Sequence, residues 1–388
     1  MRNHRLILAV GPWLVFAASL PAMADDVTTE PFEGIKVTHS KSMTPRQVDM
    51  WVVEIDLHAP GVSFLVTPSN GDLVGDTTPE TTREFVTRVG GQLGVNGSFF
   101  SLAAKGADGK LQYNVSGLSA SKGNGYSPFA AGFVDAINIS PDNVATIIRG
   151  TGKPDKEDVR KLRAYERAVK AAAVSAQPAK QDSKAPSPNP LPKGEGSKTK
   201  VQRPELNVGF EHEPAVALYN ALSGKTRLVK DGKNVAGNDP AIHPRTGIGI
   251  KSDGKLLLFT VDGREKGRSL GMKFNEMADA MIHFGARDAI SLDGGGSTTF
   301  VMDYPKTAVN DPKVMNLPCD PFSKEMEGKE HGKERPTGNN LAVFARPREV
   351  ASENGSARAA SASSTQNKCC RCGDCRSCWF NFRSCRHR

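Results

Sequence analysis

The alternation of apolar and polar residues predicts β-strands in both halves of the chain. Strict alternation occurs in residues 48–57, and residues 61–72 form an apolar run that ends in a turn. Before residue 151, the predicted strands are 48–57, 61–72, 92–100, 129–139 and 143–150. After residue 205, they are 215–222, 224–233, the hairpin 245–264, 289–292 and 339–345. Hairpins recur along the chain, and strands outnumber helices.

Two segments have the pattern of short helices that lead directly into a strand. Residues 78–91 begin with threonines, carry an early glutamate and end in glycine, which are typical start and stop signals. Residues 272–286 place Phe274, Met277 and Met281 at helical spacing. These features together predict an α+β fold, in which helices pack against a mixed β-sheet.

The composition divides the 388 residues into segments of different character. Residues 1–24 have two arginines, an apolar run and a small-residue cleavage site, which is typical of a secretory signal; an uncleaved anchor is the alternative. Residues 151–204 are rich in Pro, Ser, Gly and Lys, which predicts a disordered insertion. Residues 25–150 and 205–347 would then form a single domain, and residues 348–388 a disordered Cys/Arg-rich tail. We therefore expect an exported protein with no stable membrane span after cleavage.

The formal net charge of +9 comes from segments outside this domain. The signal contributes +2, residues 151–203 contribute +7 and residues 368–388 contribute +5, which leaves −5 for the rest. Because the predicted domain is mildly acidic, the charge gives no support to nucleic-acid binding. The composition does not indicate an oligomeric state.

Six of the seven cysteines lie in the last twenty residues, and Cys319 stands alone. The spacing Cys372-x-x-Cys375-x-x-Cys378 would suit zinc or a disulfide knot. No predicted core surrounds this cluster, and arginine alternates with cysteine, which favours an appended tail over a working metal site. Since the domain itself is nearly free of cysteine, its fold does not depend on disulfides.

The stretch ISLDGGGSTTFVM, residues 290–302, places a carboxylate and three glycines directly after an apolar strand. Asp293 would emerge at the end of that strand, where loops build sites. Successive main-chain N–H groups in the glycine turn would suit phosphate or sugar oxygens, with the Ser297 hydroxyl beside them. The alternative is a tight turn with a capping aspartate.

Polar side chains also lie at the ends of other predicted strands. HPRTGIG, residues 243–249, carries His243, Arg245 and Thr246, and the planar guanidinium of arginine matches phosphate. TVDGRE, residues 260–265, ends its strand with an aspartate. A surface arginine and an ordinary turn would each explain one of these motifs alone.

VNGSFF, residues 95–100, leaves Asn96 and Ser98 at a further strand end. Phe99 and Phe100 could form the floor of a sugar site, although a plain hairpin turn is the alternative. Four predicted strand ends with polar side chains in one chain are unlikely to be a coincidence. They favour a site that these strand ends share.

Actin-like and polyphosphatase-like ATPases also have phosphate loops that read Asp-x-Gly-Gly-Gly-Ser. Such a protein needs a second phosphate loop near the start of its domain and a supply of nucleotide. No Asp-x-Gly-Thr match follows the first predicted strand, and an exported chain would meet little nucleotide. A non-catalytic accessory for binding or exporting envelope polysaccharide is a third alternative.

The run from His243 to Met302 resembles the phosphodiester glycosidase family, which includes the uncovering enzyme that removes N-acetylglucosamine from a phosphodiester on mannose. VNGSFF and ERPTGNNLAVFA, residues 334–345, resemble other landmarks of the family in the expected order. The resemblance covers about residues 48–150 and 206–345, and it implies that the domain is catalytic. The insertion and the tail have no counterpart in the family pattern.

The resemblance and the strand-end motifs together give a candidate site without a metal. Its catalytic residues would be Asp293, Arg245 and Asn96, and its substrate-binding residues Gly294, Gly295, Gly296, Ser297, Thr246, Asp262, Ser98 and His243.

The chemistry implied by the resemblance is hydrolysis of a sugar-1-phosphodiester, by cleavage of the glycosidic C–O bond, to free sugar and a phosphomonoester. Arg245 and the turn would bind the departing phosphodiester, and Asp293 would act as nucleophile or as base for water. Asn96 would orient the sugar or the water. Spacing leaves retention and inversion both open. No His/Asp/Glu cluster has metal-ligand spacing, so we expect no metal and no cofactor; the expected partner is a sugar phosphodiester or polysaccharide substrate.

Overall fold

The computed structural model describes residues 26–44, 46–105, 109–151, 212–304, 311–320 and 332–348, and, between residues 151 and 212, only positions 160–161, 164 and 167–168. The eight-stranded sheet has the order β1 (Val27–Phe32), β2 (Ile35–Ser42), β3 (Val48–Ile55), β17 (Leu256–Val261), β16 (Arg245–Lys251), β18 (Ala286–Ser291), β14 (Arg227–Lys230), β15 (Lys233–Asn234). The six-stranded sheet has the order β12 (His212–Glu213), β11 (Ala145–Gly150), β10 (Asp135–Ile139), β13 (Asn220–Gly224), β8 (Ser119–Ser121), β9 (Asn124–Ser127). The five-stranded sheet has the order β20 (Lys313–Val314), β19 (Phe300–Met302), β5 (Leu93–Asn96), β21 (Asn340–Phe344), β4 (Ser63–Val66). A separate hairpin joins β6 (Phe100–Lys105) to β7 (Leu111–Val115).

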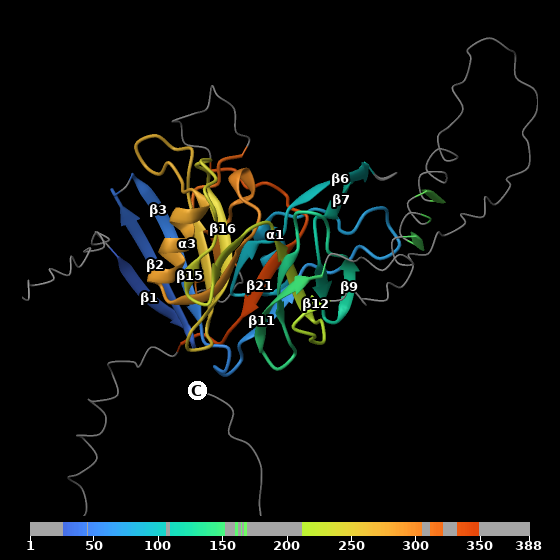
Figure 1. Ribbon diagram of the computed structural model, residues 1–388, viewed down its shortest axis with the longest axis horizontal. Helices are drawn as coiled ribbons and strands as arrows, with labels where there is room; N and C mark the ends of the chain where they lie inside the picture. Colours follow the sequence, from blue (N-terminus) through green and yellow to red (C-terminus); the bar gives the residue numbers. More distant parts are fainter. Residues whose placement is uncertain are drawn as a thin grey trace, which may run out of the picture. The chain divides into compact units, whose positions relative to one another are not determined.

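The eight-stranded sheet is buried on both faces along its central strands. In β17, Leu256 and Leu258 belong to the core shared with the other sheets, while Leu257 and Phe259 face α3 (Phe274–His283). This division follows from the alternation of side chains along a strand. In Figure 1, α3 lies in front of the strands of this sheet. Each fully buried large apolar side chain contributes about 1.5–3 kcal/mol to the stability of this core.

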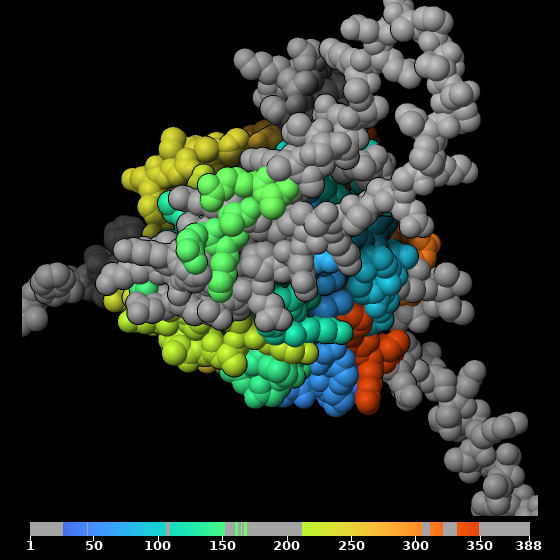
Figure 2. All heavy atoms as spheres, turned by 90° about the vertical axis from the view of Figure 1, so that its right-hand side faces the viewer, coloured from blue at the N-terminus to red at the C-terminus, as the bar shows by residue number. Residues whose placement is uncertain are grey.

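The five-stranded sheet carries α1 (Thr82–Val89) on its outer side, where Phe85 and Val86 pack against Ala342. Thr81 caps this helix by accepting the N–H of Glu84. The helix ends at Gly90, which has φ 74° and therefore takes a left-handed conformation that favours glycine. In Figure 2, blue atoms of the first half of the chain lie beside orange-red atoms near residue 340, in agreement with the pairing of β4 and β21.

The predicted α+β fold with a mixed sheet is wrong, because the described part of the protein is mostly β, with 46% of its residues in strands and 11% in helices. Every strand pairing in the described residues is antiparallel, including those that flank the helices. Each helix does connect two strands that run in the same direction. However, β16 lies between β17 and β18, and β21 lies between β4 and β5. A third strand thus separates each parallel pair: β16, the hairpin partner of β17, and β21, which lies far along the sequence from β4 and β5, so the pattern around α1 could not indicate it.

Strands from both sides of residues 152–211 belong to one sheet. β10 pairs with β13, and Gly150 in β11 pairs with His212 in β12. The predicted signal, almost all of the predicted insertion and all but one residue of the predicted tail lie outside the described residues. The structure also contains strands that the pattern did not predict, namely β1, β2, β6–β9, β12, β19 and β20. Among the residues described, no helix is both long and apolar enough to cross a membrane.

Candidate functional site around the glycine turn

The end of β5, the start of β16 and the end of β18 meet at the glycine turn. The Leu292 N–H donates to the Thr246 carbonyl at 2.8 Å, and the Asp293 N–H donates to the Gly97 carbonyl at 2.9 Å. The segment after β18 is therefore bonded both to the eight-stranded sheet and to the loop that follows β5. These contacts fix the main chain on which the Asp293 carboxylate is carried.

Asn96 is fully buried and links these segments through its side chain. Its Nδ2 donates to the Asp293 carbonyl at 2.8 Å. Its Oδ1 accepts the Thr246 hydroxyl at 2.7 Å and the Thr299 N–H at 3.1 Å. The structure thus brings together three of the candidate site residues. Because the contacts of Asn96 and Thr246 are with protein groups, their geometry is that of residues that position Asp293.

The Asp293 carboxylate is half-buried, and its Oδ1 accepts the Gly294 N–H at 2.9 Å. Burial raises the pKa of Asp293 to about 6, against the opposing effects of the Ser297 hydroxyl, the Gly294 N–H and the charges of Arg335 and Lys225. The carboxylate is therefore mostly ionised at neutral pH. In this state it can act as a nucleophile or as a general base.

The glycines of the turn allow two guanidinium groups to lie against the main chain. Gly295 has φ 63°, and a Cβ at this position would lie 3.1 Å from Arg264 Nη2. A Cβ on Gly296 would lie 2.4 Å from Arg335 Nη2, so the guanidinium would have to move away. Glycine therefore permits the close approach of Arg335 at Gly296, and at Gly295 it also suits the left-handed conformation.

The main-chain N–H groups of the turn are largely engaged within the protein. That of Gly295 donates to the Pro244 carbonyl at 2.9 Å, that of Ser297 to Gly294 at 3.3 Å, and that of Thr298 to Gly295 at 3.2 Å. The turn is held by these bonds, so the main donors available around it are the guanidinium groups.

Arg245 is buried at the start of β16, with 7% of its surface exposed. Its Nε donates to the Met272 carbonyl at 3.1 Å, its Nη2 donates to the Ala241 carbonyl at 2.7 Å, and its Cζ lies 3.8 Å from the Phe274 ring centroid. Burial lowers the pKa of Arg245 to about 10, and it forms no ion pair with any described residue. The buried positive charge of Arg245 favours the binding of an anion nearby. Two of its nitrogen atoms, Nε and Nη2, already donate to carbonyl groups of the protein.

Arg264 links three parts of the site. Its Nη2 lies 3.3 Å from His243 Nδ1, its Nη1 donates to Cys319 Sγ at 3.7 Å, and its guanidinium lies over Gly295. Burial and the charges of Arg264 and Arg245 lower the pKa of His243. His243 is therefore a neutral neighbour of the two arginines at physiological pH.

Asp262 is fully buried and binds the loop that follows β20. Its Oδ1 accepts Asn316 Nδ2 at 2.9 Å, and both carboxylate oxygens lie 3.0 Å from the Leu317 nitrogen. Asn316 also donates to the Thr298 carbonyl at 3.1 Å, at the end of the glycine turn. Burial raises the pKa of Asp262 to about 7, against the hydrogen bonds from Asn316 and Leu317 and the charge of Arg268. Asp262 therefore acts on the turn through Asn316.

Ser98 and Ser297 are both fully buried. The Ser98 N–H donates to Asn339 Oδ1 at 2.7 Å, and the Ser98 hydroxyl accepts the Ser223 N–H at 3.0 Å. Ser98 thus holds the loop after β5, whereas Ser297 lies beside Asp293 and helps to keep its carboxylate ionised.

A family model described as phosphodiester glycosidase matches residues 90–344, which is more than half of the chain and contains the whole of this site. The chain belongs to the phosphodiester glycosidase family. This membership favours the glycosidase interpretation of the glycine turn over the ATPase interpretation.

Individual relatives match shorter segments. The human N-acetylglucosamine-1-phosphodiester alpha-N-acetylglucosaminidase is 44% identical over 62 residues, which is 16% of this chain and 12% of that protein. The mouse protein of the same name is 42% identical over 109 residues, 24% of this chain and 21% of its own length. This chain thus spans about an eighth to a fifth of these relatives. A solved structure of a hypothetical protein from Synechocystis has a TM-score of 0.51 at 16% identity, covers 83% of this chain and 64% of its own, and supports the fold alone.

The sequence did not single out three cations beside the glycine turn, Arg264, Arg335 and Lys225. Arg335 donates to Asp320 Oδ1 at 2.5 Å and lies over Gly296, and Lys225 lowers the pKa of Asp293. Arg264 and Arg335 lie inside the motifs TVDGRE and ERPTGNNLAVFA, so the motifs themselves were the available signal. Isolated charges in loops otherwise resemble ordinary surface residues.

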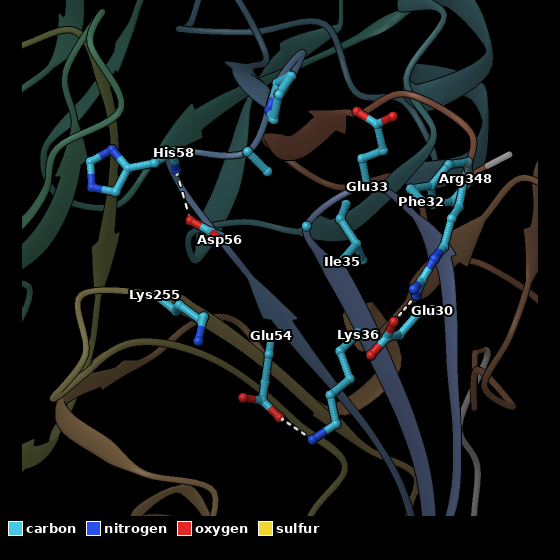
Figure 3. A pocket seen from close by; sticks show the side chains of 13 residues that line it. Glu30, Phe32, Glu33, Ile35, Lys36, Glu54, Asp56, His58, Lys255 and Arg348 are labelled. Atoms are coloured by element: carbon cyan, nitrogen blue, oxygen red, sulfur yellow. Dashed lines mark hydrogen bonds and ion pairs between the residues drawn. The ribbon is translucent and has the colours of Figure 1, made fainter.

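A cavity lies at the other end of the eight-stranded sheet. It has a volume of about 760 Å³ and is lined by the β1–β2 turn, the end of β3 and Lys255. In Figure 3, Lys36 and Glu54 form an ion pair within it, and Asp56 accepts the His58 N–H. None of the candidate site residues lines this cavity. Within the described chain, no cluster of three or more His, Cys, Asp or Glu side chains could hold a metal ion.

Proposed function

We propose that the protein hydrolyses a sugar-1-phosphodiester by cleaving the glycosidic C–O bond. The observation that carries this proposal is the half-buried Asp293 carboxylate beside a glycine turn on which the Arg264 and Arg335 guanidinium groups lie. The carboxylate suits the anomeric carbon, which becomes positively charged, and the two guanidinium groups suit the phosphate. Membership of the phosphodiester glycosidase family supports the same reaction class.

Asp293 supplies the negative charge that an oxocarbenium-like carbon needs. As a nucleophile, its carboxylate oxygen bonds to the anomeric carbon while the C–O bond to phosphate breaks, and water then hydrolyses the sugar ester. As a base, it takes a proton from water, and the water oxygen bonds to the same carbon. By either route, the bond electrons leave with the phosphomonoester, and the water oxygen ends on the sugar.

The cations supply the stabilisation of the leaving group. A phosphomonoester leaves as an anion, so it needs little general-acid help, and arginine binds its oxygens through two parallel N–H groups. Arg264 and Arg335 lie against the turn itself. Arg245 is one step further back, where its buried charge adds to the positive potential.

We extend the proposal to the setting of the reaction. Residues 25–150 and 205–347 form the catalytic domain, the protein is exported, and its substrate belongs to an envelope or extracellular polysaccharide. The secretory pattern of residues 1–24 supports export. The mildly acidic domain supports a sugar substrate over a nucleic acid.

The test is product analysis in ¹⁸O-labelled water with sugar-1-phosphodiesters, aryl glycosides, bis-aryl phosphates and ATP as substrates. We expect free sugar and phosphomonoester from the first class, with the label in the sugar. The configuration of the first-formed sugar, read by NMR, distinguishes the nucleophile route from the base route. Label in the phosphate would indicate P–O cleavage and would contradict the proposal. Polysaccharide binding without any cleavage would favour the accessory role.

A further inference from the structure

Two phenylalanines pack against each other next to the loop that follows β5. The ring centroids of Phe99 and Phe133 are 5.5 Å apart, with their planes at 53°, and both side chains are half-buried. Phe99 is two residues beyond Gly97, whose carbonyl accepts the Asp293 N–H at 2.9 Å. Since consecutive Cα atoms are about 3.8 Å apart, the main chain of Phe99 lies within about 8 Å of Gly97.

Lys225 connects the Phe99 ring with the Asp293 carboxylate. Its Nζ lies 5.8 Å from the centroid of the Phe99 ring, close enough for attraction to the ring face. The charge of the same ammonium group lowers the pKa of Asp293. Lys225 is exposed, and its ammonium group lies both beside the Phe99 ring and within electrostatic range of the Asp293 carboxylate.

The next residue, Phe100, is placed differently. Its ring is stacked on Tyr113, with centroids 4.7 Å apart and an interplanar angle of 19°, across the β6–β7 hairpin. The ring of Phe100 is therefore already covered by a parallel ring of the protein. Among the described residues, the aromatic ring beside Phe99 is that of Phe133, which is tilted at 53° and is not stacked on the Phe99 ring.

We infer that Phe99, with Phe133 beside it, is the platform on which the sugar ring of the substrate stacks. A pyranose has an apolar C–H face that removes its surface from water when it lies on an aromatic ring, while its hydroxyls stay at the edges. Lys225 can donate to those hydroxyls. This inference rests on the proposed function, and it divides the site into an aromatic half for the sugar and a cationic half at Gly295 and Gly296 for the phosphate.

Substitution of Phe99 in the full-length protein tests the platform. We expect Phe99→Leu to raise KM roughly tenfold, the equivalent of about 1.4 kcal/mol of lost contact, for the phosphodiester and also for an aryl glycoside of the same sugar. Phe99→Trp keeps a flat ring and should retain KM within about threefold. Phe284→Leu is the matched control, since Phe284 is also half-buried but lies at the C-terminal end of α3.

Binding measured without turnover separates this inference from the proposed function. Saturation-transfer NMR with the methyl glycoside of N-acetylglucosamine should show transfer from aromatic protons to the C–H protons of one face of the sugar ring. This transfer should be lost in Phe99→Leu. If the wild type hydrolyses phosphodiesters but Phe99→Leu behaves as Phe284→Leu does, the platform is wrong and the function stands. If the wild type hydrolyses nothing, the proposed function is wrong. The platform is then tested by NMR alone, and it is wrong if Phe99→Leu shows the same transfer as Phe284→Leu. Should Phe99→Leu fail to fold, Phe99→Trp and the wild-type transfer pattern still decide it.

Discussion

The two ends of the eight-stranded sheet treat charge in opposite ways. At the glycine-turn end, burial raises the pKa of Asp262 to about 7 and that of Asp293 to about 6, and lowers that of Arg245 to about 10. At the other end, hydrogen bonds from Lys251 and Lys36 outweigh burial and lower the pKa of Glu54. At the glycine-turn end, burial disfavours the charged forms of these side chains. At the other end, which we call the satisfied end, lysine partners stabilise the charged form of Glu54.

This difference, more than the size of a cavity, is the reason for placing the candidate site at the glycine-turn end. The cavity of about 760 Å³ belongs to the satisfied end, where Lys36 and Glu54 already neutralise each other at 3.0 Å. Groups with perturbed pKa values beside a specific partner are typical of catalytic sites, because a reaction needs charges that are not already compensated. A change at the glycine-turn end should therefore alter activity, and a matched change at the other end should not.

The largest effect is expected from removing the charge of Asp293. Asp293→Asn keeps the shape of the turn but removes the negative charge from the anomeric carbon, so turnover should fall by roughly 10²–10³-fold. The thermal midpoint should stay close to that of the wild type, since the substitution neutralises a carboxylate that burial opposes. Steady-state kinetics and a melting curve measure the two effects.

Asp253→Asn is the matched control for this variant. Asp253 lies in the β16–β17 turn and pairs with Lys255 at 2.8 Å in an exposed ion pair. Its replacement should leave turnover unchanged. An equal loss of turnover in Asp293→Asn and Asp253→Asn would show that the two ends of the sheet do not differ in their importance for activity.

A smaller and more selective effect is expected at Arg264. Arg264→Lys keeps the charge but loses the planar fork that fits a phosphate, so kcat/KM for the phosphodiester should fall about 10–100-fold. An aryl glycoside of the same sugar should lose less than about threefold. Arg287→Lys, at the start of β18 and paired with Asp288 at 2.9 Å, is the control.

The same change at Arg245 sharpens this test. Arg245 is stacked on Phe274 and bonded to two carbonyl groups, so Arg245→Lys should lower the thermal midpoint as well as the activity. If Arg245→Lys selectively lowered activity on phosphodiesters and Arg264→Lys did not, Arg245 would be the residue that binds the phosphate, as the sequence predicted.

The sequence predicted the parts of this site that are local. The Thr81 cap, the α3 spacing and the strand before Asp293 depend on neighbouring residues, and the structure has all of them. Family membership also followed from motifs, each contained in a short run, and the family match confirms it.

The parts that failed depend on contacts between distant segments. Nothing near β4 or β5 indicates that β21 lies between them, so the sheet was predicted as mixed. Arg264 and Arg335 reach adjacent glycines from segments 71 residues apart, and only the fold brings them together. The roles of Asn96 and Asp262 toward substrate stay predictions; the contacts that the structure adds are those of their side chains with other parts of the protein.

The pH dependence of stability should also distinguish the ends. The pKa of Asp262 is raised from 3.8 to about 7, so the folded protein holds this proton more tightly than the unfolded chain. The resulting stabilisation is complete below about pH 4 and is lost as the pH rises to about 7, on the order of a few kcal/mol. Asp293 acts in the same direction, whereas Glu54, with its lowered pKa, stabilises the protein above its usual pKa and loses this effect in acid.

Urea unfolding of the wild type and Asp262→Asn between pH 5 and 8 measures this dependence. The free energy of unfolding of the wild type should decrease over this range, and that of the variant should change less, because its amide does not titrate. Parallel curves for the two proteins would mean that Asp262 does not hold its proton as its burial requires.

The smallest effect is expected from Glu54→Gln, at the satisfied end. Glu54 accepts hydrogen bonds from Lys251 and from Lys36, whose side chain is 47% exposed. Water and salt screen the Lys36 pair, whereas the Lys251–Glu54 pair is only 15% and 14% exposed, so loss of the carboxylate should lower the free energy of unfolding by about 1–3 kcal/mol and leave kcat and KM unchanged. The double variant Lys36→Met/Glu54→Gln, compared with both single variants, isolates the contribution of the Lys36 pair. A coupling of several kcal/mol, or a change in kcat, would connect this end of the sheet to the glycine turn and break the distinction between them.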